Sequence, residues 1–167
     1  MTVYEIVPSP VGALLVAAED AGLTAVCFAP HTGRHGPGTD WRPVEHSAGS
    51  AAASVLAAAR AQLDAYFAGE RATFDLPLAP RGTPFQQRVW SALREIAFGE
   101  TISYLELARR IGDVRAVRAV GGANGRNPIP VIVPCHRVIG ADGSLTGFGG
   151  WIERKRWLLA HEGALLL

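Results

Sequence analysis

The pattern of the chain changes near its middle, so any fold has to accommodate two different halves. Before this point, short apolar runs at residues 4–7, 13–17 and 23–28 are separated by Pro, Gly and acidic residues, a pattern typical of strands joined by turns. After it, helix-capping motifs recur. At 167 residues, the chain is long enough for one compact domain or two small ones. We predict an α/β amino-terminal domain at residues 1–80 and a mainly α carboxy-terminal domain at residues 81–167.

The first half predicts a small antiparallel sheet covered by one helix. The helix is expected in an Ala-rich segment at residues 50–67 that Gly69 closes. Its apolar stripe has helical spacing and consists of Val55, Ala59, Leu63 and Phe67. Residues 31–43, rich in Gly, Pro and polar side chains, predict a surface loop, and residues 74–82 predict a linker.

The second half opens with a strong helix signal. Thr83 can cap a helix, Pro84 suits its first turn, and Gln86 can reach back to the cap. The expected buried stripe consists of Phe85, Val89, Leu93 and Ile96, and Gly99 is expected to end the helix.

Two short helices should follow. Ser103 and Glu106 form a second capping box, Gly112 ends that helix, and Asp113 can cap the next one. This arrangement predicts a helix-turn-helix whose small residues let its backbone lie close to DNA. An ordinary helical hairpin with surface arginines fits the same pattern.

Charge is divided unequally between the halves. Residues 1–80 carry four Arg and eight acidic residues, a net charge of −4, whereas residues 81–167 have a net charge of +5. Such asymmetry favours nucleic acid as a partner, although a general preference for Arg would also produce it. The first residues lack the pattern of a secretory signal, and no apolar run approaches the length of a membrane span, so we expect a cytoplasmic protein without membrane contact.

The segment at residues 127–139 carries the main candidate for chemistry. It is apolar and rigid, with three prolines, and places Cys135 beside His136 and Arg137. Neighbouring basic groups would favour the thiolate, which is the nucleophilic form of cysteine. Inert packing of a buried cysteine also fits the segment. Because adjacent residues of an extended segment point to opposite sides, a contact between Cys135 and His136 would need a bridging water.

Residues 134–138, Pro-Cys-His-Arg-Val, resemble the active-site signature of the O6-alkylguanine-DNA alkyltransferases, also called methylated-DNA–protein-cysteine methyltransferases. Residues 98–104, 118–123 and 158–163 resemble other segments of this family, in the family's order and spacing. The resemblance implies a ribonuclease-H-like amino-terminal domain, here similar only in layout, and a carboxy-terminal domain with a winged-helix-like helix-turn-helix.

The resemblance also implies catalytic roles. Cys135 would accept the alkyl group, and His136, held by Glu162, would take the thiol proton through a water. Asn127 would brace the turn under the active-site loop, although a simple Asn-Pro turn predicts much the same structure. Tyr104 would hydrogen-bond the guanine ring and help it leave as a neutral base; its alternative is a half-buried aromatic at a helix start.

Further residues are implied at the DNA. Arg118 would enter the duplex and fill the gap left when the damaged nucleotide rotates out, since sulfur cannot reach O6 inside the stacked helix. The surrounding helix and its flanks would contact the backbone of the DNA through Ala119, Gly121, Arg115, Arg126, Arg109 and Arg110.

A loop would cover the flipped base. The Gly149 N–H would point at O6, and the Val138 carbonyl would accept a hydrogen bond from the exocyclic amine. Phe148 and Gly150 would complete the loop. Phe148 and Gly149 replace the tyrosine and the serine or alanine of some relatives. Lys155 would steady the loop, although a solvated helix face would also explain a lysine there.

The function implied is a single, irreversible transfer of a methyl or other alkyl group from O6 of guanine, and from O4 of thymine, in double-stranded DNA to Cys135. The partner would be duplex DNA containing O6-alkylguanine, and the protein a monomer. No cofactor is implied. No metal site is expected, because Cys27, His31, His35 and His46 lack a finger-type spacing.

Two other functions compete with this one. A non-catalytic protein that recognises alkylated bases would not need Cys135, and such relatives have tryptophan in its place. A thiol hydrolase using Cys135 and His136 would need an oxyanion hole and turnover with water.

Overall fold

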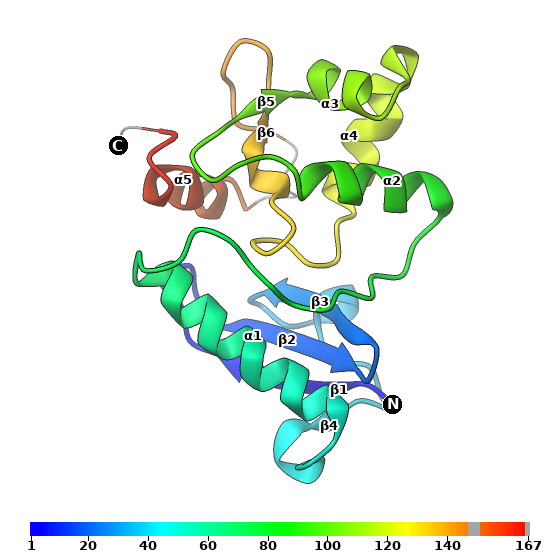
Figure 1. Ribbon diagram of the computed structural model, residues 1–167, viewed down its shortest axis with the longest axis vertical. Helices are drawn as coiled ribbons and strands as arrows, with labels where there is room; N and C mark the ends of the chain where they lie inside the picture. Colours follow the sequence, from blue (N-terminus) through cyan, green and yellow to red (C-terminus); the bar gives the residue numbers. More distant parts are fainter. Residues whose placement is uncertain (147–150, 166–167) are drawn as a thin grey trace. The chain divides into compact units, whose positions relative to one another are not determined.

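The computed structural model describes residues 1–146 and 151–165. The chain forms two compact units, Met1–Arg81 and Gly82–Leu167 (Figure 1). None of the helices in the described residues is long and apolar enough to span a membrane.

The first unit is a sheet covered by a helix (Figure 1). Strands β1 (Val3–Val7), β2 (Leu14–Glu19) and β3 (Gly22–Phe28) are antiparallel, as the alternating apolar runs predicted. The sheet order is β3-β2-β1-β4, and the short strand β4 (Arg42–Pro43) runs parallel to β1. Residues 31–43 are therefore not a plain loop, because the segment contains a 3₁₀ turn at Gly33–His35 and ends in a fourth strand.

Helix α1 (Ala51–Phe67) packs on the three long strands. Its cap is Ser50, whose Oγ accepts from the Ala53 N–H at 3.1 Å. The predicted stripe is only half right: the buried residues are Ala52, Leu56, Ala59, Leu63 and Tyr66. Val55 and Phe67 are only partly buried.

The predicted linker at residues 74–82 pairs with the outer edge of β3. The Leu23 N–H donates to Pro77 O at 2.8 Å, and the Ala79 N–H donates to Leu23 O at 2.7 Å. This approach requires Gly22, which has a φ of 148°, because a Cβ there would lie 2.6 Å from Pro77 O.

The second unit contains helices α2 (Pro84–Leu93), α3 (Tyr104–Arg110), α4 (Val117–Gly125) and α5 (Ile152–His161). Strands β5 (Ile102–Ser103) and β6 (Val138–Ile139) form a small parallel pair. The unit is mainly helical, as the sequence predicted.

Both ends of α2 can be compared with the sequence prediction. The capping box at Thr83 is confirmed: its Oγ1 accepts from the Gln86 N–H at 3.1 Å, and the Thr83 N–H donates to Gln86 Oε1 at 3.0 Å. The predicted end at Gly99 was wrong, because α2 ends at Leu93 and turns follow. Ile96 is nevertheless buried, as predicted.

Helices α3 and α4 form the predicted helix-turn-helix. Ser103 Oγ accepts from the Glu106 N–H at 3.0 Å, while the Glu106 carboxylate pairs with Arg109 and Arg110. Asp113 caps a 3₁₀ turn at Val114–Ala116 that leads directly into α4. Helix α2 packs against both helices.

Candidate active site and nucleic-acid interface

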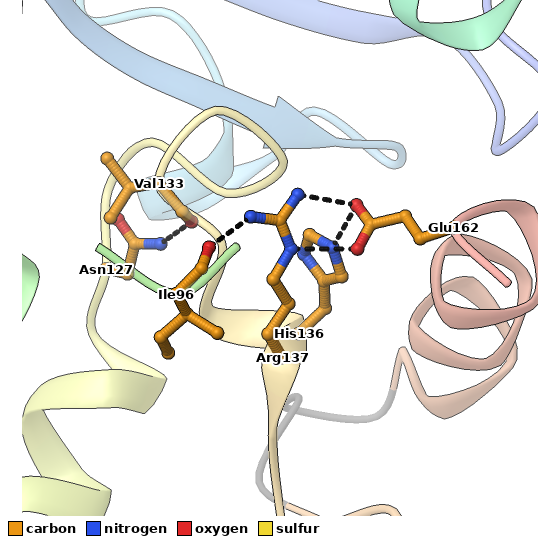
Figure 2. A network of polar contacts seen from close by, with 6 residues as sticks. All are labelled: Ile96, Asn127, Val133, His136, Arg137 and Glu162. Carbon is orange, nitrogen blue, oxygen red and sulfur yellow. Dashed lines mark hydrogen bonds and ion pairs between the residues drawn. The ribbon is translucent and has the colours of Figure 1, made fainter. Parts of the chain in front are cut away.

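Asn127 fixes the loop that leads from α4 to Cys135. Its Nδ2 donates to Val133 O at 2.8 Å (Figure 2), and its Oδ1 accepts from the Ile129 N–H at 3.0 Å. The loop is buried from Ile129 onward. Val131 has a φ of 73°, a conformation that β-branched residues rarely adopt. The hydrogen bonds of Asn127 thus hold the loop in an unusual path.

Cys135 begins a 3₁₀ turn, Cys135–Arg137, that follows this loop. The Cys135 N–H donates to Val133 O at 2.8 Å, and the Arg137 N–H donates to Pro134 O at 3.0 Å. The side chain of Cys135 is buried, with 4% of the residue exposed. Burial raises the pKa of its thiol to about 11, and the Asn127 side chain opposes this rise. The resting group is therefore a thiol.

The prediction that Arg137 favours the thiolate was wrong, because its guanidinium is engaged elsewhere (Figure 2). Its Nε donates to Glu162 Oε1 at 2.8 Å and its Nη2 to Glu162 Oε2 at 2.9 Å. Its Nη1 donates to the Ile96 carbonyl at 2.6 Å. The Glu162 carboxylate, which follows the end of α5, has no exposed side-chain surface. The result is a buried, bidentate ion pair.

His136 shares the same carboxylate. Its Nε2 lies 2.8 Å from Glu162 Oε2, and its ring is fully buried (Figure 2). Among the described residues, its Nδ1 has no hydrogen-bond partner. Burial lowers the pKa of His136, while Glu162 opposes this effect. A neutral imidazole with an unpartnered nitrogen, next in sequence to a protonated thiol, is suited to act as a base.

Tyr104 begins α3 and lies against α4. A Cβ on Gly121 would be 3.8 Å from the Tyr104 ring, so the absence of a side chain on Gly121 leaves room beside that ring. The Tyr104 hydroxyl donates to Thr146 O at 3.1 Å, and burial raises the pKa of this phenol. The residue is partly buried at the start of a helix, as the interpretation of a half-buried aromatic predicted.

Lys155 is fully buried, so the alternative of a solvated helix face was wrong. Its Nζ donates to Val138 O at 2.6 Å and to Thr146 O at 2.8 Å. Burial lowers its pKa to about 8. The Val138 carbonyl, which we expected to face the exocyclic amine of a base, thus already accepts one hydrogen bond. Three predicted loop residues lie outside the described residues: Phe148, Gly149 and Gly150.

The predicted DNA-contacting residues lie along the helix-turn-helix. Arg118 and Ala119 are exposed in the first turn of α4, and Arg115 is exposed in the 3₁₀ turn before it. Arg126 is exposed at the other end of α4, and Gly121 is partly buried between them. Arg109 and Arg110 are also exposed, but their guanidinium groups pair with Glu106.

The sequence did not reveal the contacts of two polar residues at the site, Asn124 and Arg137. Asn124 is buried in α4, and its Nδ2 donates weakly to Cys135 O at 3.5 Å. Arg137 was noted only as a nearby charge, because nothing in the sequence indicates that it meets Glu162, 25 residues away.

Cys27 is buried in β3, where burial raises its pKa to about 11. The described residues contain no cluster of His, Cys, Asp and Glu that would hold a metal.

Two protein-family models match the two units. One, described as the ribonuclease-like domain of 6-O-methylguanine DNA methyltransferase, matches residues 2–80. The other, described as the DNA binding domain of the same protein, matches residues 84–164. The chain therefore belongs to the 6-O-methylguanine DNA methyltransferase family.

Curated relatives and solved structures agree with this assignment. A methylated-DNA–protein-cysteine methyltransferase of Methanosarcina acetivorans is 48% identical over 96% of the chain and 98% of that protein. One from Mycobacterium tuberculosis is 51% identical over 95% of the chain and 91% of that protein. The crystal structure of the M. tuberculosis O6-methylguanine methyltransferase superposes with a TM-score of 0.83 at 48% identity, covering 100% of this chain and 96% of that one. A further structure shows the M. tuberculosis protein, there called OGT, in complex with DNA, with a TM-score of 0.81 at 51% identity and coverage of 96% and 92%.

Proposed function

We propose that this protein repairs double-stranded DNA by moving a methyl or other alkyl group from O6 of guanine, or O4 of thymine, to Cys135. The observation that carries the proposal is the buried His136–Glu162 pair directly beside Cys135 in a chain of this family. The names of the relatives, and the DNA complex of one of them, support the same function.

The chemistry follows from the protonation states at the site. Burial keeps Cys135 as a thiol, so a base must take its proton before the sulfur can attack. His136 Nδ1 would accept that proton through a bridging water. Sulfur then forms a bond to the alkyl carbon, the bond from this carbon to O6 breaks, and its electron pair stays on the guanine. The guanine would regain a proton, which balances the one that His136 takes from the thiol, and the Tyr104 hydroxyl would hydrogen-bond the ring as it leaves.

The product would be a thioether, which has no good leaving group. Each molecule would therefore act once, as a monomer on one lesion. A non-catalytic protein that only recognises alkylated DNA would not need a cysteine at position 135.

Access to the sulfur requires the base to leave the helix. Arg118, exposed at the start of α4, is suited to fill the gap, and Ala119 beside it leaves room for the duplex. Arg115 and Arg126 would contact phosphates. In the pocket, the Val138 carbonyl and Tyr104 would face the base. The loop containing Phe148, Gly149 and Gly150 would cover the base, and Lys155 would support that loop.

Mass spectrometry tests the proposal directly. Incubation with a short duplex carrying one O6-methylguanine should add a single methyl group to the peptide that contains Cys135. The Cys135→Ala variant should gain no methyl group yet bind the same duplex with nearly unchanged affinity, because recognition rests on other residues. Cys27→Ala is the matched control and should be methylated normally. An unmodified wild-type protein would refute the proposal.

A further inference from the structure

Arg137 contacts the Glu162 carboxylate of the His136–Glu162 pair, and the catalytic roles described above do not use it. Its guanidinium donates to both Glu162 oxygens, and His136 Nε2 contacts one of the same oxygens (Figure 2). We infer that Arg137 is a positioning residue that keeps His136 neutral, with its proton on Nε2, and so leaves Nδ1 able to accept a proton.

The hydrogen-bond pattern fixes the tautomer. A guanidinium has only donors and stays protonated in proteins, so the carboxylate that it grips with two parallel bonds is ionised. An ionised carboxylate only accepts, and therefore the His136 nitrogen at 2.8 Å must carry the hydrogen. In a neutral ring the other nitrogen, Nδ1, is then the acceptor.

The charges explain why the ring remains neutral. With Arg137 present, Glu162 already has a cation, and a second proton on His136 would create a net positive charge in a buried site. Without Arg137, the buried carboxylate would have only His136 to neutralise it, and the imidazole would become its counter-ion. A protonated His136 has no lone pair and cannot act as a base.

The surrounding structure fixes the position of the Arg137 side chain. Its third nitrogen donates to the Ile96 carbonyl at 2.6 Å, which ties the guanidinium to the turn after α2. Its side chain is 7% exposed, so water does not screen the charge. Being adjacent in one 3₁₀ turn, Arg137 and His136 reach the same carboxylate from neighbouring positions.

Few other charges act on the ring. Lys155 on α5 acts in the same direction as Arg137, and Glu162 opposes both. Helix α2 also packs against this turn, but its charged residue, Arg88, donates to Ile111 O. Arg137 forms an ion pair with the same Glu162 carboxylate that His136 contacts.

Nitrogen NMR on ¹⁵N-histidine-labelled protein tests the inference without any DNA. The chain has five histidines, and a His136→Gln spectrum identifies the ring in question. Wild-type His136 should be neutral at pH 7 and protonated only on Nε2. Arg137→Met should raise the proton affinity of His136 more than about thirtyfold, from a pKa below the ordinary 6.5, so that the ring carries both protons at pH 7.

Two further variants separate charge from shape. Arg137→Lys keeps the positive charge and should leave His136 neutral. Arg137→Met/Glu162→Gln removes both charges, and His136 should be neutral again. A wild-type ring that is protonated at pH 7 or carries its proton on Nδ1, or a neutral ring in Arg137→Met, would overturn the inference. If Arg137→Met does not fold, the tautomer of His136 in the wild type and the protonation state of His136 in Arg137→Lys still test the inference.

A rate measurement links the ring to the proposed function, on which this last step rests. Single-turnover transfer by Arg137→Met should fall at least tenfold at pH 7 and recover as the pH rises, whereas a purely structural defect would lower the rate equally at every pH. Transfer that falls equally at every pH would contradict the role of Arg137. Absence of transfer by the wild type would refute the proposed function but would leave the NMR result standing.

Discussion

The Lys155 ammonium donates to the Val138 carbonyl at 2.6 Å from a side chain that has no exposed surface. The same ammonium and the Tyr104 hydroxyl both donate to the Thr146 carbonyl, at 2.8 and 3.1 Å. Helix α5 and the start of α3 therefore meet at Thr146, and the Lys155 ammonium also joins them to strand β6. Because removing this cation from water costs free energy, its burial should make the stability of the protein depend on pH.

Lys155 should make stability increase at alkaline pH. Its pKa is about 8 in the folded protein and near 10.5 when unfolded, so between these values the unfolded chain binds more protons. The destabilisation, on the order of 3 kcal/mol, is complete below pH 8 and relieved as the pH rises toward 10.5. Urea unfolding of the wild type and of Lys155→Met should show it as a rise in the difference between their unfolding free energies. A difference that is independent of pH would mean that folding does not lower the pKa of Lys155 and that the side chain stays charged in the folded protein throughout this range.

The rate of alkyl transfer should be nearly independent of pH from about 7 to 9. His136 has a pKa lowered by burial and Cys135 has one raised to about 11, so the total charge of the pair is constant between them. The rate should fall only below the ordinary histidine value of 6.5, where the base becomes protonated. Attack by a thiolate formed without a base behaves differently, since roughly one thiol in ten thousand is ionised at pH 7. Its rate would rise tenfold per pH unit, and single-turnover assays with an O6-methylguanine duplex would detect that slope.

Asn127→Ala should destabilise the protein and slow transfer. The change leaves the Ile129 N–H without a partner inside a buried loop, at a cost of about 1–3 kcal/mol, and removes one of the two hydrogen bonds that Val133 O accepts. Asn124→Ala is the matched control, because its bond to Cys135 O is long, 3.5 Å, and its Oδ1 has no partner among the described residues. Denaturant unfolding should give the larger loss for Asn127→Ala. Equal losses would show that Asn127 does not brace the loop.

The elements predicted correctly are those with local signals. The capping oxygens of Thr83 and Ser103 mark the starts of α2 and α3 as predicted, because a cap acts within three residues. Asp113 was expected to cap the next helix but caps the 3₁₀ turn before it, and α4 begins at Val117 without a side-chain cap. Strand β4 was missed because its two residues pair only through β1, far away in the chain. The predicted buried face of α1 included Val55, whereas the structure buries its neighbour Leu56, because the sheet determines which side of an Ala-rich helix is covered.

The sequence likewise predicted only part of the site. The sequence motif placed Cys135 next to His136, and the resemblance paired His136 with Glu162, as the 2.8 Å contact confirms. The charge state of the thiol was not predictable, because burial and the pairing of Arg137 are properties of the folded chain. A basic residue next to a cysteine in sequence does not by itself lower the pKa of its thiol.

The remaining prediction concerns the nucleotide-flipping step. Arg118→Ala should slow repair within a duplex far more than reaction with free O6-benzylguanine, because the residue lies exposed on α4 and is not part of the His136–Glu162 network. A free base needs no extrusion, so the loss of the guanidinium should leave its rate almost unchanged. The duplex loses whatever part of the few kcal/mol of unstacking energy the arginine offsets.

Arg126→Ala is the matched control for this prediction, since Arg126 is equally exposed at the other end of the same helix. Removing a cation that binds phosphate should weaken binding to every DNA sequence and reduce its salt dependence, without selecting the flipping step. Single-turnover rates with both substrates, measured for both variants at saturating protein, separate the two roles. If Arg118→Ala slows the free base as much as the duplex, then Arg118 supports the fold of the active site, and another residue must hold the gap open.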